Sequence, residues 1–554
     1  MKLVTVVMIV LVGWSSLSQA ANIHDPRAIN ADPTKAQEPI APRLEGLGTH
    51  SLLVSTDNKD SQYFFDQGLR LTYGFNHSEA LRSFKEAARL DPKNAMAYWG
   101  WALVLGPNIN LPMQPEVAEQ AFAAIQTAML LKNNVTEIER AYIDALAVRY
   151  APVAPNDRHS LDVDYAEAMR ALTVKYPDEL DAATLYGASL MDLSPWDYWE
   201  GDGRPKPNTK KIMATFESVI ERDSRHPGAI HYYIHTVEVA LPQQGEAPAD
   251  VLRHLMPGAG HMVHMPSHIY MRVGRYADAF QVNREAADAD SSYIAQCNAQ
   301  GIYPLIYYPH NLHFLVWAAM FQGRSVDALA GAREVQSKIP TDMGNGFGVF
   351  ETFLSQPMYV MVRFGLWDKA LAEPKPDAQF RFMTGVWHYM RGMANANTGK
   401  TAQARSELRA LRGLRDELTD AYVIGFQTAP TLLTIAEHLL AGEMAARQND
   451  FDTAIPLLSR AARLEDSLRY SEPPDWYFPT RHVLGAVLLQ AGFPREAAAV
   501  YWQDLRKNPD NAYSLLGVSQ ALQAQGDQVG ASEMAARFER AWAAADVELN
   551  SSRF

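Results

Sequence analysis

Histidine is concentrated in the middle of this chain, at spacings that bring side chains together on a helix. Eight of the 16 histidines lie between positions 231 and 313. In that part, "HYYIH" and "HMVHMPSH" contain pairs four residues apart, and "HNLH" contains a pair three apart. Residues at these spacings share one helix face, and imidazole is the commonest side-chain ligand of transition metals. The sequence therefore predicts a metal site, with candidate ligands His231, His235, His261, His264, His268, His310 and His313.

The residue types narrow the choice of metal. Nitrogen ligands, alone or with a carboxylate, suit copper, zinc or iron and disfavour calcium and magnesium. A structural zinc site made of four thiolates is excluded, because Cys297 is the one cysteine of the chain. The pairs at 231/235 and 264/268 are the first candidates for direct ligation, and Glu238 is a candidate ligand or general base. Whether such a metal would be catalytic stays open.

A second interpretation of the same residues needs no metal. Neutral histidines and neighbouring tyrosines would together grip a peptide or another polar ligand. The tyrosines concerned are Tyr232, Tyr233, Tyr307 and Tyr308. Pro266 is a further complication, because a helix that starts there would leave His261 and His264 in the preceding turn.

The rest of the sequence supplies the elements that must position these side chains. Helix-type periodicity runs through most of it, and strand-like alternation is scarce. The segment "FFDQGLRLTYGFNHSEALRSFKEAARLDPKNAMAYWGWA" resembles a tetratricopeptide repeat (TPR), with Gly68, Ala80, Phe84, Ala87 and Pro92 at the signature places. Similar glycine and alanine spacings return near 261–293 and 309–340 and several times toward the C-terminus.

The resemblance implies an all-α fold, a TPR-type α-solenoid of antiparallel helix pairs with a concave inner surface. In this family the first helix of each pair lines that surface, which would turn the candidate histidines toward one region. An unrelated helical bundle is the alternative. The expected divisions are a signal peptide at 1–20, an extended lead-in at 21–58, TPR-like repeats at 59–132, an irregular segment at 133–215, histidine-rich repeats at 216–345, atypical repeats at 346–430 and C-terminal repeats at 431–546.

The irregular segment contains an aromatic stretch, "SPWDYWEGDGRPKP". It is either an inserted loop that covers the concave surface or an ordinary connection between helices. Histidines outside the central cluster, among them His388, His438 and His482, are expected to be packed or surface residues.

Composition limits the possible partners of the protein, and the N-terminus indicates its cellular location. A net charge of −13 argues against sequence-independent nucleic-acid binding, which needs a basic face. "MKLVTVVMIVLVGWSSLSQA" has the pattern of a secretory signal peptide, so we expect a periplasmic or secreted protein without a membrane span after its removal.

Two classes of function follow. One is an exported solenoid with a histidine-rich transition-metal site, with or without enzymatic activity. The other is a non-catalytic scaffold whose groove binds a peptide, a partner helix or a small molecule. Phosphate-loop, zincin and nucleophile-elbow motifs are missing from the sequence.

Overall fold

The computed structural model describes residues 23–341 and 348–554. The expected signal peptide at 1–20 lies outside these residues. The chain divides into two compact units, which are treated separately below. The N-terminal unit comprises Asn22–Ile269 and Glu285–Tyr308, and the C-terminal unit comprises Tyr270–Arg284 and Pro309–Phe554.

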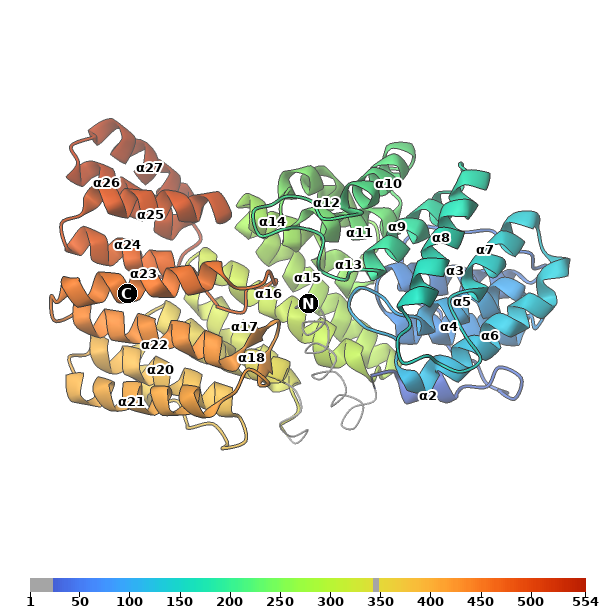
Figure 1. The fold of residues 1–554 in the computed structure, drawn as a ribbon, viewed down its shortest axis with the longest axis horizontal. Helices are drawn as coiled ribbons and strands as arrows, with labels where there is room; N and C mark the ends of the chain where they lie inside the picture. Colours follow the sequence, from blue (N-terminus) through green and yellow to red (C-terminus); the bar gives the residue numbers. More distant parts are fainter. Residues whose placement is uncertain (1–22, 342–347) are drawn as a thin grey trace. The chain divides into compact units, whose positions relative to one another are not determined.

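Helices make up nearly all regular structure of the N-terminal unit (Figure 1). They are α2 (Pro26–Asn30), α3 (Lys59–Tyr73), α4 (His77–Leu90), α5 (Ala95–Leu105), η2 (Pro115–Val117), α6 (Ala118–Leu131), η3 (Lys132–Asn134), α7 (Glu137–Ala147), α8 (His159–Lys175), α9 (Leu180–Asp192), α10 (Thr209–Arg222), α11 (Pro227–Val237), η4 (Pro242–Gly245), α12 (Glu246–Leu252), α13 (Gly260–His264) and the π-helical turn η5 (Tyr303–Tyr307).

The C-terminal unit is built in the same way, with one short antiparallel hairpin. Its elements are α17 (Ser325–Lys338), α18 (Gly348–Arg363), α19 (Trp367–Ala372), α20 (Arg381–Asn397), α21 (Thr401–Glu417), β1 (Val423–Ile424), β2 (Gln427–Thr428), α22 (Ala429–Ala446), α23 (Phe451–Asp466), α24 (Thr480–Gln490), α25 (Pro494–Lys507), α26 (Ala512–Ala524) and α27 (Gln528–Ala541). The chain passes between the units within α14 (Pro266–Val273), within α15 (Tyr276–Cys297) and at the start of α16 (Tyr308–Phe321).

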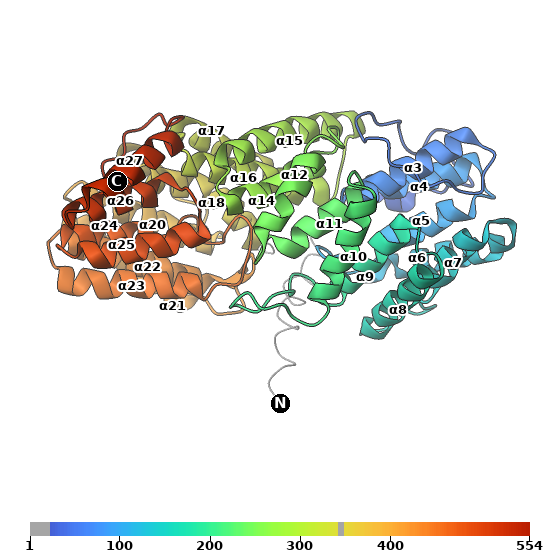
Figure 2. The ribbon, with the colours of Figure 1, turned by 90° about the horizontal axis from the view of Figure 1, so that it is seen from above.

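Consecutive helices pack on one another, as the repeat pattern predicts. In the N-terminal unit, α3 packs on α4, α4 on α5 and α5 on α6; in the C-terminal unit, α22 to α27 follow one another in the same way (Figure 2). Short connections between such neighbours make each pair antiparallel. The fold is therefore an all-α, TPR-type solenoid architecture.

Glycines at the signature positions explain the close helix approach. Gly68 and Gly100 both lie against the Phe84 ring, where a Cβ atom would come within 2.7 and 2.4 Å of it, respectively. Gly485 and Gly517 enclose Tyr501 in the same way, with would-be Cβ distances of 2.4 and 2.2 Å. A large aromatic side chain on one helix thus fills the space that two glycines leave on its neighbours.

Apart from α2, the residues from 23 to 58 form turns, bends and irregular structure, and polar side chains of the first repeat hold them in place. The backbone N–H of Ile40 donates to Glu86 Oε2 and that of Leu44 to Gln67 Oε1, both at 2.8 Å. Within residues 23–341 and 348–554, no helix combines the length and the apolar character needed to cross a lipid bilayer.

Candidate metal centre

Helix α11 carries the first histidine pair into the interior of the N-terminal unit. His226 caps this helix, because its Nδ1 accepts the Ala229 N–H at 3.2 Å, and Pro227 begins it. Every residue of α11 is buried, and the four-residue spacing places His231 and His235 on the same face. Their Nε2 atoms lie 3.1 Å apart.

The second group of histidines lies on two short helices rather than on one long one. α13 ends at His264, and α14 begins at Pro266, as the proline suggested. The single helical stripe expected for His261, His264 and His268 is therefore broken at Met265. The break leaves all three histidines buried in the same region.

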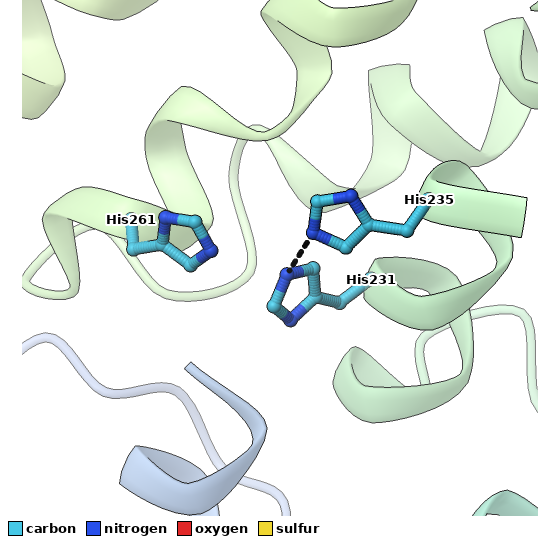
Figure 3. A group of neighbouring side chains, drawn as sticks. All are labelled: His231, His235 and His261. Atoms are coloured by element: carbon cyan, nitrogen blue, oxygen red, sulfur yellow. Dashed lines mark hydrogen bonds between the residues drawn. The ribbon is translucent and has the colours of Figure 1, made fainter. Parts of the chain in front are cut away.

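Five imidazole rings form a closed circuit. Taken in the order His231, His235, His268, His264, His261 and back to His231, neighbouring ring centroids are 4.9, 5.4, 4.8, 5.7 and 5.0 Å apart. Each of these side chains is at most 2% exposed. Figure 3 shows His231 and His235, from one helix, turned toward His261 on another. One nitrogen from each of these three residues can be chosen so that all lie within 4.8 Å of one another.

The partners of the Nδ1 atoms determine which nitrogen of the first pair carries a proton. His231 Nδ1 lies 2.6 Å from the backbone oxygen of Tyr73, which can only accept a hydrogen bond. His235 Nδ1 lies 3.4 Å from Glu238 Oε1, which accepts when ionised. Both Nδ1 atoms are therefore the donors, and in the neutral rings both Nε2 atoms carry lone pairs that point at each other.

Burial keeps these rings neutral. Burial and then the neighbouring His235 lower the pKa of His231 well below its usual value. Burial and then His268 lower the pKa of His235 in the same way. Two lone pairs facing each other at 3.1 Å repel in a buried site, whereas a cation bound by both removes the conflict.

Glu238 lies between the two histidine pairs and contacts both. Its Oε2 accepts from His268 Nδ1 at 2.6 Å, while its Oε1 faces His235. A carboxylate on the Nδ1 side of a histidine fixes the ring orientation and raises the basicity of Nε2, as in many metal sites. The same residues, His235, Glu238 and His268, also form a group close enough to hold an ion directly.

The second pair has an arrangement that a hydrogen bond alone satisfies. His264 Nε2 and His268 Nε2 are 2.9 Å apart. Ser267 Oγ lies 3.2 Å from His264 Nδ1 and, unlike a carbonyl, its hydroxyl can donate. If it does so, His264 donates through Nε2 to His268. The need for a cation is therefore stronger at His231 and His235.

Three aromatic side chains lie next to the cluster: Tyr307, which the sequence singled out, Trp196, which lies in the aromatic stretch, and Phe75, which the sequence did not single out. Between ring centroids, Phe75 lies 4.5 Å from His231 and 5.5 Å from His261, and Tyr307 lies 5.0 Å from His261. Trp196, from the aromatic stretch, lies 5.0 Å from His235. That stretch connects α9 to α10, so it is a connection that also covers the cluster.

Two of these aromatic residues adopt a backbone conformation that costs energy. Phe75 has φ +55° and Trp196 has φ +59°, in the left-handed region that L residues rarely occupy. Such strain persists where the surroundings require it and is common at functional sites. At Phe75 it turns the chain sharply after α3 and leaves the Tyr73 carbonyl available to His231.

A small cavity borders the cluster. It has a volume of about 20 Å³, comparable with the space that one water molecule needs. His24, His77 and Tyr303 line it, together with Phe75 and Tyr307, which also contact His261.

A second group of titratable residues lies at the other end of Tyr73. Its hydroxyl donates to Asp181 Oδ1 at 2.5 Å, and His50 Nε2 is 2.9 Å from the same oxygen. Burial opposes ionisation of Asp181, but hydrogen bonds from His226 and His50 hold its pKa well below the usual value. These contacts connect the lead-in to α9 and α11, and no local pattern in the sequence indicates them.

The structure places the remaining candidates in the C-terminal unit. His310 and His313 lie on α16, where His310 packs on Phe314 with ring centroids 5.1 Å apart. His313 is 6% exposed, and burial lowers its pKa to about 3. Outside the central cluster, where packed or surface histidines were expected, His388 contacts Glu407 and His482 contacts Asp504.

Comparison with known proteins gives distant likenesses in structure alone. No family model and no curated protein matches this sequence. Among solved structures, a human IFIT1 dimer with m7Gppp-AAAA is 13% identical, with 89% of this chain and 92% of that chain covered and a TM-score of 0.28. Yeast Tom70 is 11% identical, with coverage of 86% and 97% and a TM-score of 0.31. The APC/C hetero-tetramer Cut9–Hcn1 is 11% identical, with coverage of 87% and 76% and a TM-score of 0.30. The fold assignment rests on the helix packing described above.

Proposed function

We propose that this protein binds a transition-metal ion through His231, His235 and His261, on a TPR-like helical scaffold. The observation that carries the proposal is the pair of Nε2 lone pairs facing each other at 3.1 Å in a buried site. Nitrogen ligands of a tetrahedral zinc ion, each at ~2.0–2.1 Å from the metal, are separated by roughly 3.3 Å. The pair is thus close to the separation that such an ion requires.

The surroundings also suit a bound ion. The Tyr73 carbonyl and Glu238 hold the Nδ1 sides of the two rings, so that little reorganisation is needed on binding. Zinc, copper and iron are the metals of choice for imidazole ligands. Three protein ligands leave one tetrahedral position for water or a substrate, which is the usual arrangement of catalytic zinc. Glu238, placed behind the ligands, would orient them and is available for proton transfer.

Metal analysis of tag-free protein tests this proposal. Purified protein is treated with a chelator, reconstituted with Zn²⁺ and then dialysed, and its metal content is measured by mass spectrometry. The double variant His231→Ala/His235→Ala should lose the bound metal. The control His159→Ala/His438→Ala, which removes two histidines outside the cluster, should keep it. Equal metal content in the wild type and in the cluster variant would overturn the proposal.

The helical-repeat architecture itself favours a second candidate, a scaffold that binds a peptide or a partner helix. The two candidates differ in what the cluster does. If the histidines serve only to grip a partner, the wild-type protein will retain no metal after reconstitution and dialysis, and partner binding will not respond to chelators.

Export remains part of the proposal as a sequence-based prediction. Residues 1–20 are expected to direct the chain across a membrane and to be removed. Fusion of residues 1–58 to a phosphatase that is active only after export provides the test. Activity that disappears when Val6, Ile9 and Val12 are replaced by Asp would support it, and an inactive wild-type fusion would refute it.

A further inference from the structure

We propose that the C-terminal unit binds a small organic oxyanion, a carboxylate or a phosphate, at the Nε–Nη2 edge of Arg363. Arg363 is the last residue of helix α18, and only 3% of its surface is exposed. The inference is independent of the metal site, because every residue that carries it belongs to the C-terminal unit.

A hydrogen bond through Nη1 and two aromatic rings hold Arg363 in place. Its Nη1 donates to His482 Nδ1 at 3.1 Å, and His482 Nε2 in turn donates to Asp504 Oδ2 at 2.8 Å. The Tyr513 ring lies under the guanidinium, 3.4 Å from Cζ to the ring centroid, and Phe478 lies 4.5 Å away. These contacts fix the orientation of the group without placing a carboxylate directly on it.

Asp504, the carboxylate whose charge acts on Arg363, is occupied by other donors. Asp504 accepts from Ser514 Oγ at 2.6 Å and from Asn511 Nδ2 at 2.9 Å, in addition to His482. The printed hydrogen bonds connect Asp504 to Arg363 through the imidazole ring of His482. Among the described residues Arg363 makes no ion pair with a carboxylate. A buried guanidinium without a direct counter-ion is costly, because such groups in proteins are normally paired.

The two remaining nitrogens of Arg363 form the edge that recognises oxyanions. Nε and Nη2 are buried and make no hydrogen bond to any described residue. Elsewhere in the chain, Arg89 uses this same edge on a carboxylate, with Nε and Nη2 at 2.8 and 2.6 Å from the two oxygens of Glu86. The planar fork matches carboxylate and phosphate oxygens, so the edge of Arg363 is ready to bind one.

Further polar atoms extend from this edge along the same face of α18. Thr352 Oγ1, Ser355 Oγ and Tyr359 OH are buried and likewise have no hydrogen-bond partner among the described residues. Their spacing of three and four residues, continued by Arg363, defines one helix stripe. Buried polar atoms are almost always satisfied, so four consecutive exceptions on one stripe indicate a polar ligand.

Aromatic residues lie next to the stripe and indicate what kind of ligand it would bind. Tyr477 stacks on Tyr359 with ring centroids 4.2 Å apart, and Trp476 lies 5.9 Å from Tyr359. Trp476 Nε1 is another buried donor without a partner among the described residues. The donors and the flat rings together suit a small molecule with an oxyanion at one end and hydrogen-bond acceptors along its length.

Calorimetric titration of the full-length protein with succinate, benzoate and inorganic phosphate tests this inference. At least one of the three should bind saturably. Arg363→Lys, which keeps the charge but removes the fork, should weaken that binding about tenfold or more. Preference for succinate or benzoate would identify a carboxylate ligand, and preference for phosphate would identify a phosphate ligand.

Two controls make the result specific. Arg391→Lys should leave binding unchanged, because Arg391 already uses Nε on Glu407 Oε1 and Nη1 on the Leu371 carbonyl. His231→Ala/His235→Ala should also bind the anion normally, which separates this site from anion binding at the metal. Absence of saturable binding by all three probes, or equal affinity in folded Arg363→Lys, would overturn the inference. If Arg363→Lys does not fold, Tyr359→Phe decides: a several-fold loss supports the site, and unchanged affinity refutes it.

Discussion

The Nε2 atoms of His231 and His235 lie 3.1 Å apart, each on a ring whose Nδ1 faces an oxygen that accepts a hydrogen bond. The four-residue spacing on α11 brings the two rings together, and their oxygen partners decide which nitrogens face each other. The second pair differs at this point, because the Ser267 hydroxyl allows an ordinary hydrogen bond between His264 and His268. Proximity alone therefore does not indicate a metal, whereas proximity with both lone pairs turned inward does.

Replacing Glu238 with Gln should weaken metal binding about 10–100-fold. The amide has nearly the same shape but lacks the charge that orients His235 and His268 and makes their Nε2 atoms more basic. Competition between the protein and a chromophoric chelator for Zn²⁺ measures this affinity. Glu217→Gln is the control: this carboxylate accepts a hydrogen bond from Tyr233 in the same unit, and its replacement should leave the Zn²⁺ affinity unchanged. An unchanged affinity in Glu238→Gln would show that the carboxylate does not orient the ligands.

Metal should also stabilise the folded chain. An ion that binds the native state alone raises the free energy of unfolding by about 2.7 kcal/mol when its free concentration is 100 times the dissociation constant. Urea titrations with Zn²⁺ and with a chelator should differ by about this amount in the wild type. The difference should vanish in His231→Ala/His235→Ala. A difference of equal size in that variant would mean that zinc binds elsewhere.

Sequence reasoning succeeded where the signal is local. The glycine and aromatic positions of the repeat, such as Gly68 and Phe84, predicted the helix pairs because each helix needs a small residue where a neighbour's ring packs. The spacing of His231 and His235 predicted a shared helix face, and Pro266 correctly marked the break between α13 and α14.

Contacts between distant parts of the chain were beyond that reasoning. The carbonyl that fixes His231 belongs to Tyr73, 158 residues earlier, and it is available because α3 ends there. The positive φ of Phe75 and Trp196, which brings two rings to the cluster, has no counterpart in residue type or spacing. Such features follow from tertiary packing, which one sequence does not display. The metal ligands themselves stay a prediction.

The repeat packing makes a direct prediction about glycine. Gly100→Ala would place a Cβ atom 2.4 Å from the Phe84 ring, so we expect a loss of about 1–3 kcal/mol in the free energy of unfolding. Gly413→Ala is the matched control, because its Cβ would have no neighbour within 4 Å and the helix gains roughly 0.5–1 kcal/mol from alanine. Chemical denaturation of both variants measures the two changes. Similar effects at the two positions would contradict the role of Phe84 as the side chain that fills the space between adjacent helices.

His313 should make the C-terminal unit less stable in mild acid. Burial lowers its pKa from 6.5 to about 3. Below pH 6.5 the unfolded chain therefore binds a proton that the folded chain does not, and the free energy of unfolding falls by up to about 1.4 kcal/mol per pH unit. Between pH 6.5 and 5 this share amounts to about 1.7 kcal/mol, because the unfolded group is only half protonated at pH 6.5. Urea titrations at several pH values should show that His313→Gln removes it, whereas His159→Gln, at an exposed position, leaves the pH dependence unchanged. A pH dependence that is identical in the wild type and in His313→Gln would show that His313 is protonated as readily in the folded chain as in the unfolded one.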